Sequence, residues 1–412
     1  MPKFGLGEVK LIRLIDYSKE DEVYICFTNQ FMKYYLIAGE ASGDLHGSNL
    51  IKEIRKRDGD AVMHCWGGEL MEQSGAVVDK HYRELAFMGF TEVLMNIRTI
   101  LKNFTRCKKN ILEFNPDIVI LIDYPGFNLR MAKWAKKQKY KVVYYISPQV
   151  WAWKENRVKI IKENVDKMLT ILPFEKDFYK KWSFDADYVG HPLIEAVSSF
   201  HSSVTSNRQQ GNANNLQIPD SKPIIALLPG SRKQELHHQL PLMLAVTKFF
   251  PGYTFIIAKA PSQEDELYKD YLKDYPDILT VRNLTYDLLS KARAACVTSG
   301  TATLETALFG VPEVVCYKAG SISYHIAKWL ANVKYISLVN LIMDKPIVKE
   351  LIQEKLTIEN LRMELDHILN DSQRIQQMKS DYAQLKSLLS GDGNASGNAA
   401  EIIIKLLAEP YG

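Results

Sequence analysis

The sequence predicts an α/β protein built from two doubly wound, Rossmann-like domains that face each other across a cleft. At 412 residues the chain is too long for one ordinary hydrophobic core. Runs of apolar, often β-branched residues alternate with helical patterns, which is typical of parallel strands covered on both faces. The alternation occurs twice, before and after a linker-like stretch at Ser198–Pro219 that is rich in Ser, Asn and Gln.

These patterns divide the chain into five segments. Residues 1–31 are a polar, irregular N-terminal extension. A first domain is expected at 32–197, a linker at 198–220 and a second domain at 221–372. The last segment, 373–412, has apolar positions at helical spacing and is expected to pack back on the first domain.

Composition excludes several classes of protein. The chain has 46% hydrophobic and 24% charged residues, which indicates a globular protein rather than a disordered one. A net charge of only +4 does not predict nucleic-acid binding. Five cysteines at scattered spacings predict reduced thiols in a cytoplasmic protein, without a zinc pattern. No apolar run is long enough to span a membrane, so any membrane contact is expected to be peripheral.

Three turns in the first half follow strong strands. The strands are expected at Tyr34–Ala38, Ile118–Ile122 and Val142–Ile146, and the turns that follow them begin at Gly39, Asp123 and Ser147. Because ligands of parallel sheets bind at the carboxyl ends of strands, the three turns predict one rim of a binding cleft. The turn at Gly39–Asp44 lacks the GxGxxG spacing of dinucleotide loops, so on its own it is weak evidence.

The second half contains a candidate anion site. The stretch Val297–Pro312 predicts a strand end, a small-residue turn and a short helix, whose first N–H groups and dipole would face a phosphate. Glu305, one turn inside this helix, could accept hydrogen bonds from ribose hydroxyls. The stretch fits equally well an ordinary capped connection closed by Gly310 and Pro312.

A second strand-end turn, Pro229-Gly-Ser-Arg232, carries a guanidinium. The planar fork of Arg suits a diphosphate because it donates two parallel hydrogen bonds. A single Gly-Ser-Arg turn usually connects a strand to a helix without binding a ligand. Together with the small residues at 299–303 in the same half, it favours a phosphate site.

The motifs taken together resemble those of lipid-A-disaccharide synthases. They stand in the family's order: Gly39-Glu-Ala-Ser-Gly-Asp44, Phe87-Met-Gly-Phe90 with Glu92-Val-Leu94, Ile122-Asp-Tyr-Pro-Gly-Phe-Asn128, Ser147-Pro-Gln-Val-Trp-Ala-Trp153, Val189-Gly-His-Pro192, Leu228-Pro-Gly-Ser-Arg232 and Ser299-Gly-Thr-Ala-Thr-Leu-Glu305. The likeness runs from Met32 to the C-terminus, and the last two motifs are shared more widely among sugar-nucleotide enzymes of the two-domain GT-B fold. Two departures are Val339, where the family usually has proline, and a polar insert at 203–215.

The resemblance implies an inverting, metal-independent glycosyltransferase of lipid A and lipopolysaccharide biosynthesis in a Gram-negative bacterium. It would transfer 2,3-diacylglucosamine from UDP-2,3-diacylglucosamine to the 6-hydroxyl of 2,3-diacylglucosamine 1-phosphate, without a cofactor. Its expected location is the cytoplasm, in peripheral contact with the inner membrane. The alternatives are a UDP-sugar epimerase or hydrolase of the same fold, from another enzyme class, and a non-catalytic sugar-nucleotide-binding protein.

The resemblance also assigns roles to residues. The donor would be held by Gly230, Ser231, Arg232, Ser299, Gly300, Thr301, Thr303, Glu305 and Asn340, and the acceptor by Glu40, Ser42, Gly43, Asp44, Met88 and Phe90. The last two lie in an apolar stretch that would bind acyl chains or enter lipid, or else would pack in the core.

Asp123 is the expected general base, because it follows a strand and precedes a Pro-Gly turn that would present it at the rim. Asp123 could instead cap the helix after Phe127. Asp44 and Glu40 are the other candidates for the base.

Overall fold

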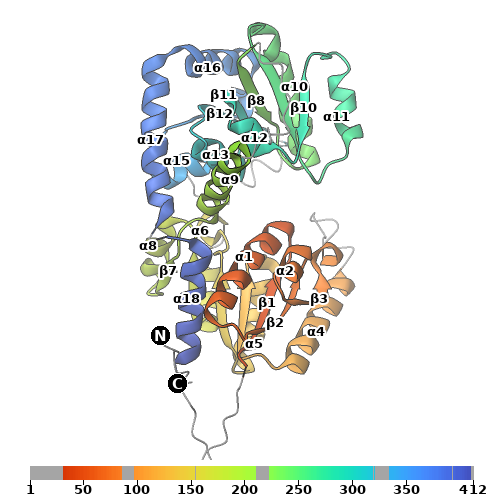
Figure 1. Cartoon of the computed structure of the whole chain (residues 1–412), viewed down its shortest axis with the longest axis vertical. Coiled ribbons are helices and arrows are strands. Elements are labelled where there is room, and N and C mark those ends of the chain that lie inside the picture. Colours follow the sequence, from red (N-terminus) through yellow and green to blue (C-terminus); the bar gives the residue numbers. More distant parts are fainter. Residues whose placement is uncertain are drawn as a thin grey trace, which may run out of the picture.

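Two parallel sheets form the framework of the protein. The computed structural model describes residues 31–85, 97–153, 155–209, 222–318, 320, 334–391 and 393–409. In Figure 1 the two sheets lie in separate lobes, one above the other. The two doubly wound domains expected from the sequence are therefore confirmed.

The first domain is a seven-stranded sheet with the strand order β3-β2-β1-β4-β5-β6-β7. All its neighbouring strands pair in parallel, with Leu36 opposite Ile120 between β1 and β4. Its elements are β1 (Lys33–Ala38), α1 (Ala41–Arg57), β2 (Val62–Gly67), α2 (Glu69–Gln73), β3 (Val77–His81), α4 (Ile97–Phe114), β4 (Ile118–Ile122), α5 (Pro125–Lys137), β5 (Lys141–Tyr145), α6 (Val150–Trp153), α7 (Arg157–Asn164), β6 (Lys167–Thr170), α8 (Pro173–Lys181) and β7 (Ala186–Tyr188).

The second domain is a six-stranded parallel sheet with the order β10-β9-β8-β11-β12-β13. Leu227 of β8 lies opposite Cys296 of β11. Its elements are α9 (Pro192–Gln209), β8 (Ile224–Leu228), α10 (Lys233–Val246), β9 (Thr254–Lys259), α11 (Asp265–Leu272), β10 (Leu279–Arg282), α12 (Thr285–Leu289), β11 (Ala292–Thr298), α13 (Thr301–Leu308), β12 (Glu313–Tyr317), α15 (Leu338–Met343), β13 (Lys349–Ile352), α16 (Ile358–Asn370) and α17 (Ser372–Ser390). The last helix of the chain, α18 (Ala395–Ala408), follows α17.

The central strands are buried on both faces, which explains their continuous apolar sequences. Every residue of β4, β5 and β8 is buried. On one face of the first sheet the core includes residues of α1 and α18, and on the other face residues of α4, α5 and α7. Burying apolar surface stabilises the fold by about 25 cal/mol per Å². Because the central strands are stabilised in this way, the turns at their carboxyl ends are held at fixed positions.

Each sheet reverses its strand order at one point. In the first sheet, β1 and β4 are neighbours from which the chain proceeds in opposite directions, and in the second sheet β8 and β11 are such neighbours. A crevice opens at the carboxyl ends of the strands where the order reverses, and ligands of doubly wound folds bind there. The turns that follow these four strands are those at Gly39, Asp123, Gly230 and Ser299.

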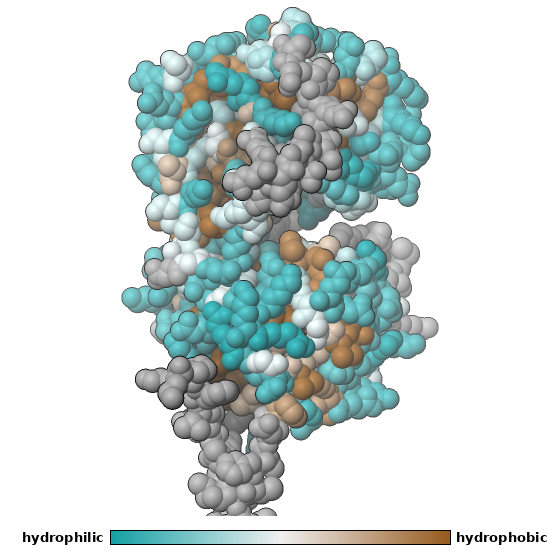
Figure 2. Space-filling model, viewed as in Figure 1, coloured by the Kyte–Doolittle hydropathy of each residue, from teal (hydrophilic) through white to brown (hydrophobic). Residues whose placement is uncertain are grey.

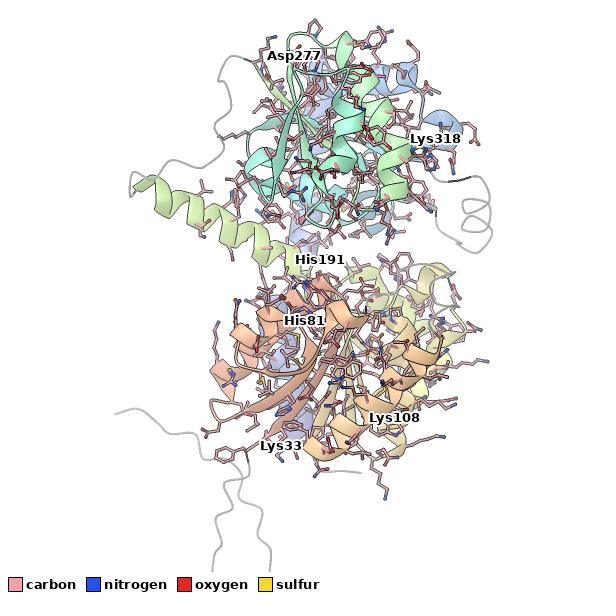
Figure 3. The ribbon with its side chains drawn as sticks, turned by 90° about the vertical axis from the view of Figure 1, so that its right-hand side faces the viewer. Lys33, His81, Lys108, His191, Asp277 and Lys318 are labelled. Atoms are coloured by element: carbon pink, nitrogen blue, oxygen red, sulfur yellow. The ribbon has the colours of Figure 1, made fainter. Side chains whose placement is uncertain are left out.

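The chain crosses between the lobes twice, and the crossings touch. The backbone N–H of His191 donates to the carbonyl of Leu389 at 3.0 Å. Gly190 and Gly391 both have positive φ, and a Cβ on Gly391 would come within 3.4 Å of the Gly190 Cα. Figure 3 shows His191 between the two lobes, and Figure 2 shows a hollow between them on the side away from α17.

Helix α9 begins just after the first crossing and extends to Gln209, so part of the segment expected as a linker is helical. Leu193 and Val197 of this helix are buried in the core of the second domain. At the other end of the chain, α18 packs against α1 and β5 of the first domain, although α17 belongs to the second. In Figure 1, α18 accordingly lies beside the lower lobe. The domain boundaries themselves stay predictions.

Candidate active site

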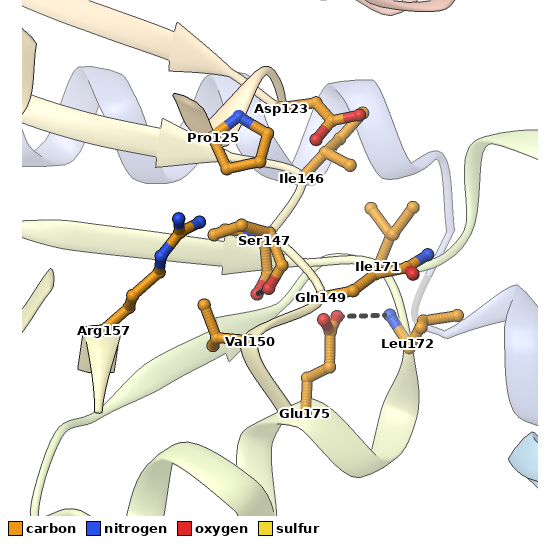
Figure 4. A pocket seen from close by; sticks show the side chains of 11 residues that line it. Asp123, Pro125, Ile146, Ser147, Gln149, Val150, Arg157, Ile171, Leu172 and Glu175 are labelled. Carbon is orange, nitrogen blue, oxygen red and sulfur yellow. Dashed lines mark hydrogen bonds between the residues drawn. The ribbon is translucent and has the colours of Figure 1, made fainter. Parts of the chain in front are cut away.

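Asp123 lines a pocket of about 420 Å³ beside the first switch point. The pocket is formed by the turns after β4, β5 and β6 and by the starts of α7 and α8 (Figure 4). Its lining residues are Asp123, Pro125, Ile146, Ser147, Pro148, Gln149, Val150, Arg157, Ile171, Leu172 and Glu175. Of the three turns expected to form one rim, those at Asp123 and Ser147 therefore line a concave site, and the turn at Gly39 is not part of its lining.

The backbone at Asp123 is held in an uncommon conformation. Asp123 and Tyr124 have φ of 45° and 50°, and Ile146, across the pocket, has φ of 65°. A β-branched residue at positive φ is an outlier that costs on the order of 1–3 kcal/mol. Several hydrogen bonds hold the turn in place: the Asp123 N–H donates to the Tyr145 carbonyl at 3.1 Å, and the Asp123 carbonyl accepts from Asn128 Nδ2 at 2.8 Å and from the Tyr144 hydroxyl at 2.6 Å.

The Asp123 carboxyl titrates above its ordinary range. Burial and, to a lesser extent, the negative charge of Glu40 together raise the pKa of Asp123 to about 6, and a backbone hydrogen bond from Tyr124 opposes the rise. A carboxylate with this pKa is ionised at neutral pH and still basic enough to take a proton from a hydroxyl as it reacts. The side chain is half-buried, so a ligand can reach it.

Asp123 does not cap the following helix. Helix α5 begins at Pro125, and its N-cap position is Tyr124, which makes no side-chain capping bond. The capping role considered for Asp123 is therefore not what the structure shows. Its carboxylate faces the pocket in Figure 4.

Asp44, one of the other carboxylates considered as base, is held by backbone. Its side chain is 2% exposed and accepts from the N–H groups of Gly68 at 2.7 Å, Leu70 at 3.1 Å and Met71 at 3.1 Å. These N–H groups belong to the N-cap and first turn of α2, so a carboxylate from α1 satisfies the start of a neighbouring helix. The carboxylate of Asp44 therefore anchors the start of α2, and its expected contact with the acceptor stays a prediction.

Replacing Asp44 with Asn should lower the free energy of unfolding by about 2–4 kcal/mol, because the amide turns a donor toward N–H groups and loses the charge that strengthens these bonds. Urea denaturation followed by circular dichroism measures the change. The exposed Glu72 of α2, changed to Gln, is the matched control and should change stability by less than about 0.5 kcal/mol. An equally small effect at Asp44 would contradict the anchoring role.

The other expected acceptor residues differ in exposure. Glu40 and Ser42 are exposed at the start of α1. Gly43 is buried, and a Cβ there would meet the Ala38 Cβ at 3.1 Å, so this glycine lets α1 pack closely on β1. Met88 and Phe90 lie outside the described residues.

In the turn after β8, two backbone N–H groups already bind a side chain of α10, the helix that follows. The carboxylate of Glu235 accepts from the N–H groups of Ser231 at 2.9 Å and Arg232 at 3.2 Å. Gly230 has φ of 101°, and a Cβ there would come within 2.5 Å of Glu235 Oε2. The Arg232 side chain is 78% exposed, with one ion pair to Glu235 at 3.2 Å. The guanidinium, not the turn's N–H groups, is the part open to a ligand.

The turn after β11 leads into α13, whose first residues are exposed to solvent. Ser299 is engaged, since its hydroxyl donates to the Ile336 carbonyl at 2.8 Å, and the buried Thr303 hydroxyl donates to the Gly300 carbonyl at 2.8 Å. Gly300 and Thr301 are exposed at the start of α13, where first-turn N–H groups lack acceptors within the helix. Glu305 accepts from the Tyr286 hydroxyl at 3.0 Å, and burial raises the pKa of its carboxyl.

The side chain of Asn340 has a structural role in this fold, and its expected contact with the donor stays a prediction. Asn340 is 1% exposed. Its Nδ2 donates to the Val348 carbonyl and to Glu350 Oε1, both at 2.9 Å, and its Oδ1 accepts from the Val348 N–H at 2.9 Å. The amide thus has its polar atoms engaged in holding the chain before β13.

Two charged residues of the pocket, Arg157 and Glu175, were not among the site residues expected from the sequence. Glu175 is buried, and its carboxylate accepts from the Leu172 N–H at 3.1 Å and from Trp151 Nε1 at 3.2 Å. Burial raises the pKa of Glu175 to about 7, against these hydrogen bonds and one from Ser147. Arg157 lies in a Lys-rich run whose composition is typical of a solvent-exposed helix face. The one sequence signal for either is nearness to the Ser147–Trp153 turn.

Among the described residues, no group of three or more His, Cys, Asp or Glu is arranged to hold a metal ion. Within the same part of the chain, no helix has both the length and the apolar content needed to cross a membrane.

Solved structures with a similar backbone confirm the GT-B type of fold. The UDP-GlcNAc 2-epimerase from Neisseria meningitidis, bound to UDP-GlcNAc, matches with a TM-score of 0.63 and 14% identity, over 92% of this chain and 100% of that one. CalG4, the calicheamicin glycosyltransferase, matches with a TM-score of 0.57 and 16% identity, over 92% and 99%. At such low identity these likenesses concern the fold alone.

Sequence relatives are more specific. The family model for lipid-A-disaccharide synthetase matches residues 34–403. The lipid-A-disaccharide synthase of Syntrophus aciditrophicus is 38% identical over 90% of this chain and 97% of its own length, and that of Coxiella burnetii is 36% identical over 90% and 98%. These matches favour the synthase over the epimerase and binding-protein alternatives. The chain belongs to the lipid-A-disaccharide synthase family of UDP-sugar-dependent glycosyltransferases.

Proposed function

We propose that this glycosyltransferase moves 2,3-diacylglucosamine from its UDP carrier to the 6-hydroxyl of 2,3-diacylglucosamine 1-phosphate, with Asp123 as the general base. The products are the β-1,6-linked disaccharide 1-phosphate and UDP. The observation that carries the proposal is the position of Asp123: a carboxylate with a pKa raised to about 6 lines a pocket beside the switch point of the first sheet.

The reaction is a single displacement. Asp123 accepts the proton of the 6-hydroxyl while the hydroxyl oxygen attacks the anomeric carbon of the donor from the side opposite UDP. A bond forms between that oxygen and carbon as the bond from the carbon to the β-phosphate oxygen breaks, and the electron pair leaves on UDP. One displacement inverts the anomeric configuration. Positive charge beside the diphosphate stabilises the leaving group.

The second switch point is the proposed donor site. The exposed start of α13 at Gly300 and Thr301 offers N–H groups and the positive end of the helix to the diphosphate. Arg232 adds a guanidinium from the neighbouring turn after β8. Glu305, half-buried and already holding the Tyr286 hydroxyl, is placed to accept hydrogen bonds from the ribose.

Acylated substrates require work at a lipid surface, and α4 offers a suitable face. Leu101 and Leu112 of this helix are 58% and 53% exposed, and the basic residues Lys102, Arg106 and Lys109 between them are exposed too. An amphipathic helix with cations beside its apolar side chains binds anionic bilayers peripherally. We assign α4 to contact with the cytoplasmic surface of the inner membrane.

One assay tests the reaction. Purified protein is incubated with UDP-2,3-diacylglucosamine, with and without 2,3-diacylglucosamine 1-phosphate, and products are followed by mass spectrometry. Disaccharide that forms only when both are present supports the proposal. Release of UDP or isomerised sugar without the acceptor would show a hydrolase or epimerase. No turnover with either mixture would indicate a protein that binds sugar nucleotides without catalysis.

Turnover should increase with pH through an apparent pKa near 6 and then level off, because the base works only when ionised and burial raises its pKa. The measurement is kcat with both substrates saturating, from about pH 5 to 8. Glu40→Gln removes a negative charge that raises the pKa of Asp123, so it should move the inflection to lower pH. Glu175 also titrates in the pocket, with a pKa of about 7. Glu175→Gln should keep the acid limb, and loss of the limb there would assign it to Glu175.

A further inference from the structure

Arg157 brings a positive charge into the Asp123 pocket. Of the described residues that line the pocket, it is the only cation. Its side chain is half-buried, and Figure 4 shows the guanidinium turned toward Pro125 and Ser147. Lys136, on the adjacent helix α5, pairs with Asp166. By contrast, no carboxylate of the described residues forms an ion pair with Arg157.

The two carboxyls of the pocket do not neutralise this charge. Glu175 is bonded to the Leu172 N–H and to the Trp151 indole instead. Burial raises the pKa of both Glu175 and Asp123. A guanidinium that lines a pocket without a bound carboxylate keeps its planar donor fork available for a ligand anion.

The position of Arg157 is fixed relative to Asp123. Arg157 begins α7, which packs on α5, the helix that follows Asp123, and Val158 and Ile161 of α7 are fully buried. The Tyr144 hydroxyl links the two, since it donates to the Asp123 carbonyl at 2.6 Å and its pKa is influenced by the charges of both Asp123 and Arg157. Arg157 and Asp123 are therefore two groups of one site.

We propose that Arg157 binds the anomeric phosphate of the acceptor and thereby turns the 6-hydroxyl toward Asp123. The inference rests on the proposed function, in which the acceptor carries a hydroxyl and a phosphate at opposite ends of one sugar. A base and a cation in one pocket match these two groups. The donor diphosphate is assigned to the other domain, so the acceptor is the phosphate-bearing ligand of this pocket.

The same pair of charges sets the orientation of the sugar. An acceptor bound in reverse would place its phosphate against the ionised Asp123 and leave Arg157 unpaired, and both effects are unfavourable. Arg157 is a positioning residue: it raises the fraction of bound acceptor in which the hydroxyl faces the base.

The test compares two enzymes on two acceptors. Wild type and Arg157→Ala are assayed with 2,3-diacylglucosamine 1-phosphate and with the same sugar lacking the phosphate, in neutral detergent micelles so that no phospholipid headgroup competes. Wild type should prefer the phosphorylated acceptor in kcat/KM by roughly one to two orders of magnitude. Arg157→Ala should reduce this preference to within a few-fold while the KM for the donor stays unchanged. Arg157→Lys, which keeps the charge but loses the fork, should be intermediate.

Lys159, exposed on the same helix and outside the pocket lining, gives the matched control, and Lys159→Ala should keep the full preference. Arg157→Ala with an undiminished preference would overturn the inference. Wild type that uses both acceptors equally would overturn it too, while leaving the proposed transfer intact. Wild type that uses neither acceptor would reject the proposed acceptor itself, and the inference with it.

Discussion

Replacing Asp123 with Asn should lower kcat by a factor of roughly 10² to 10⁴, with the fold and the affinity for UDP retained. Asn has nearly the same shape but cannot take the proton of the attacking hydroxyl. Its amide is neutral, so it also avoids the burial cost that raises the pKa of the Asp123 carboxyl to about 6. The variant should therefore be at least as stable as wild type, which separates a chemical defect from a folding defect.

We expect three measurements to test this. Steady-state kinetics with both substrates give kcat, a calorimetric titration gives the affinity for UDP, and a melting curve gives the stability. Glu175→Gln is the matched control, because it changes the other carboxyl of the same pocket and leaves the proposed base in place. Near-normal turnover of Asp123→Asn, together with a lowered melting temperature, would identify a structural residue. Glu40→Gln would then be the next variant to assay. Glu40 was the other exposed candidate for the base, and its charge acts on the Asp123 carboxyl.

The sheets could be predicted from the sequence because their signal is local. Strands such as β4 and β8 are continuous apolar runs that end in small or polar turns, and burial on both faces requires that pattern. The place of Asp123 followed directly, since a residue after a parallel strand lies at the ligand-binding edge whatever the details of packing.

The roles of individual polar residues could not be predicted, because they depend on partners distant along the chain. Asp44 binds the backbone of Gly68–Met71, at least 24 residues away, and its motif gives no sign of this. Asn340 is held by Val348 and Glu350. Both residues were expected to contact ligands, and the structure shows in addition that both side chains stabilise backbone near the strand ends.

Helix α9 shows how tertiary burial overrides local composition. The Ser-rich sequence after Ser198 has low helical preference and reads as a linker. The helix nevertheless continues to Gln209. Its first turns insert Leu193 and Val197 into the core of the second domain, and the ring of Phe200 lies 5.6 Å from that of Phe309. Packing of this kind cannot be seen in a window of sequence.

Arg232→Ala should lower kcat/KM for the donor by roughly 30- to 1,000-fold, which corresponds to about 2–4 kcal/mol of transition-state stabilisation. The guanidinium is the exposed cation of the turn after β8, and it would donate two parallel hydrogen bonds to the departing diphosphate. Stability should hardly change. The pair that Arg232 makes with Glu235 is exposed, and such pairs contribute at most about 1 kcal/mol.

The matched control is Lys233→Ala, because Lys233 is the next residue, is exposed and carries the same charge. If Arg232 acts through specific hydrogen bonds to the diphosphate, the control should keep nearly full activity, and Arg232→Lys should recover only part of the loss. If the turn attracts the donor only through its net charge, the Arg232 and Lys233 variants should lose similar amounts, and both losses should shrink at high salt. Activity of Arg232→Ala within a few-fold of wild type would remove Arg232 from the donor site and leave the start of α13 as the diphosphate contact in the second domain.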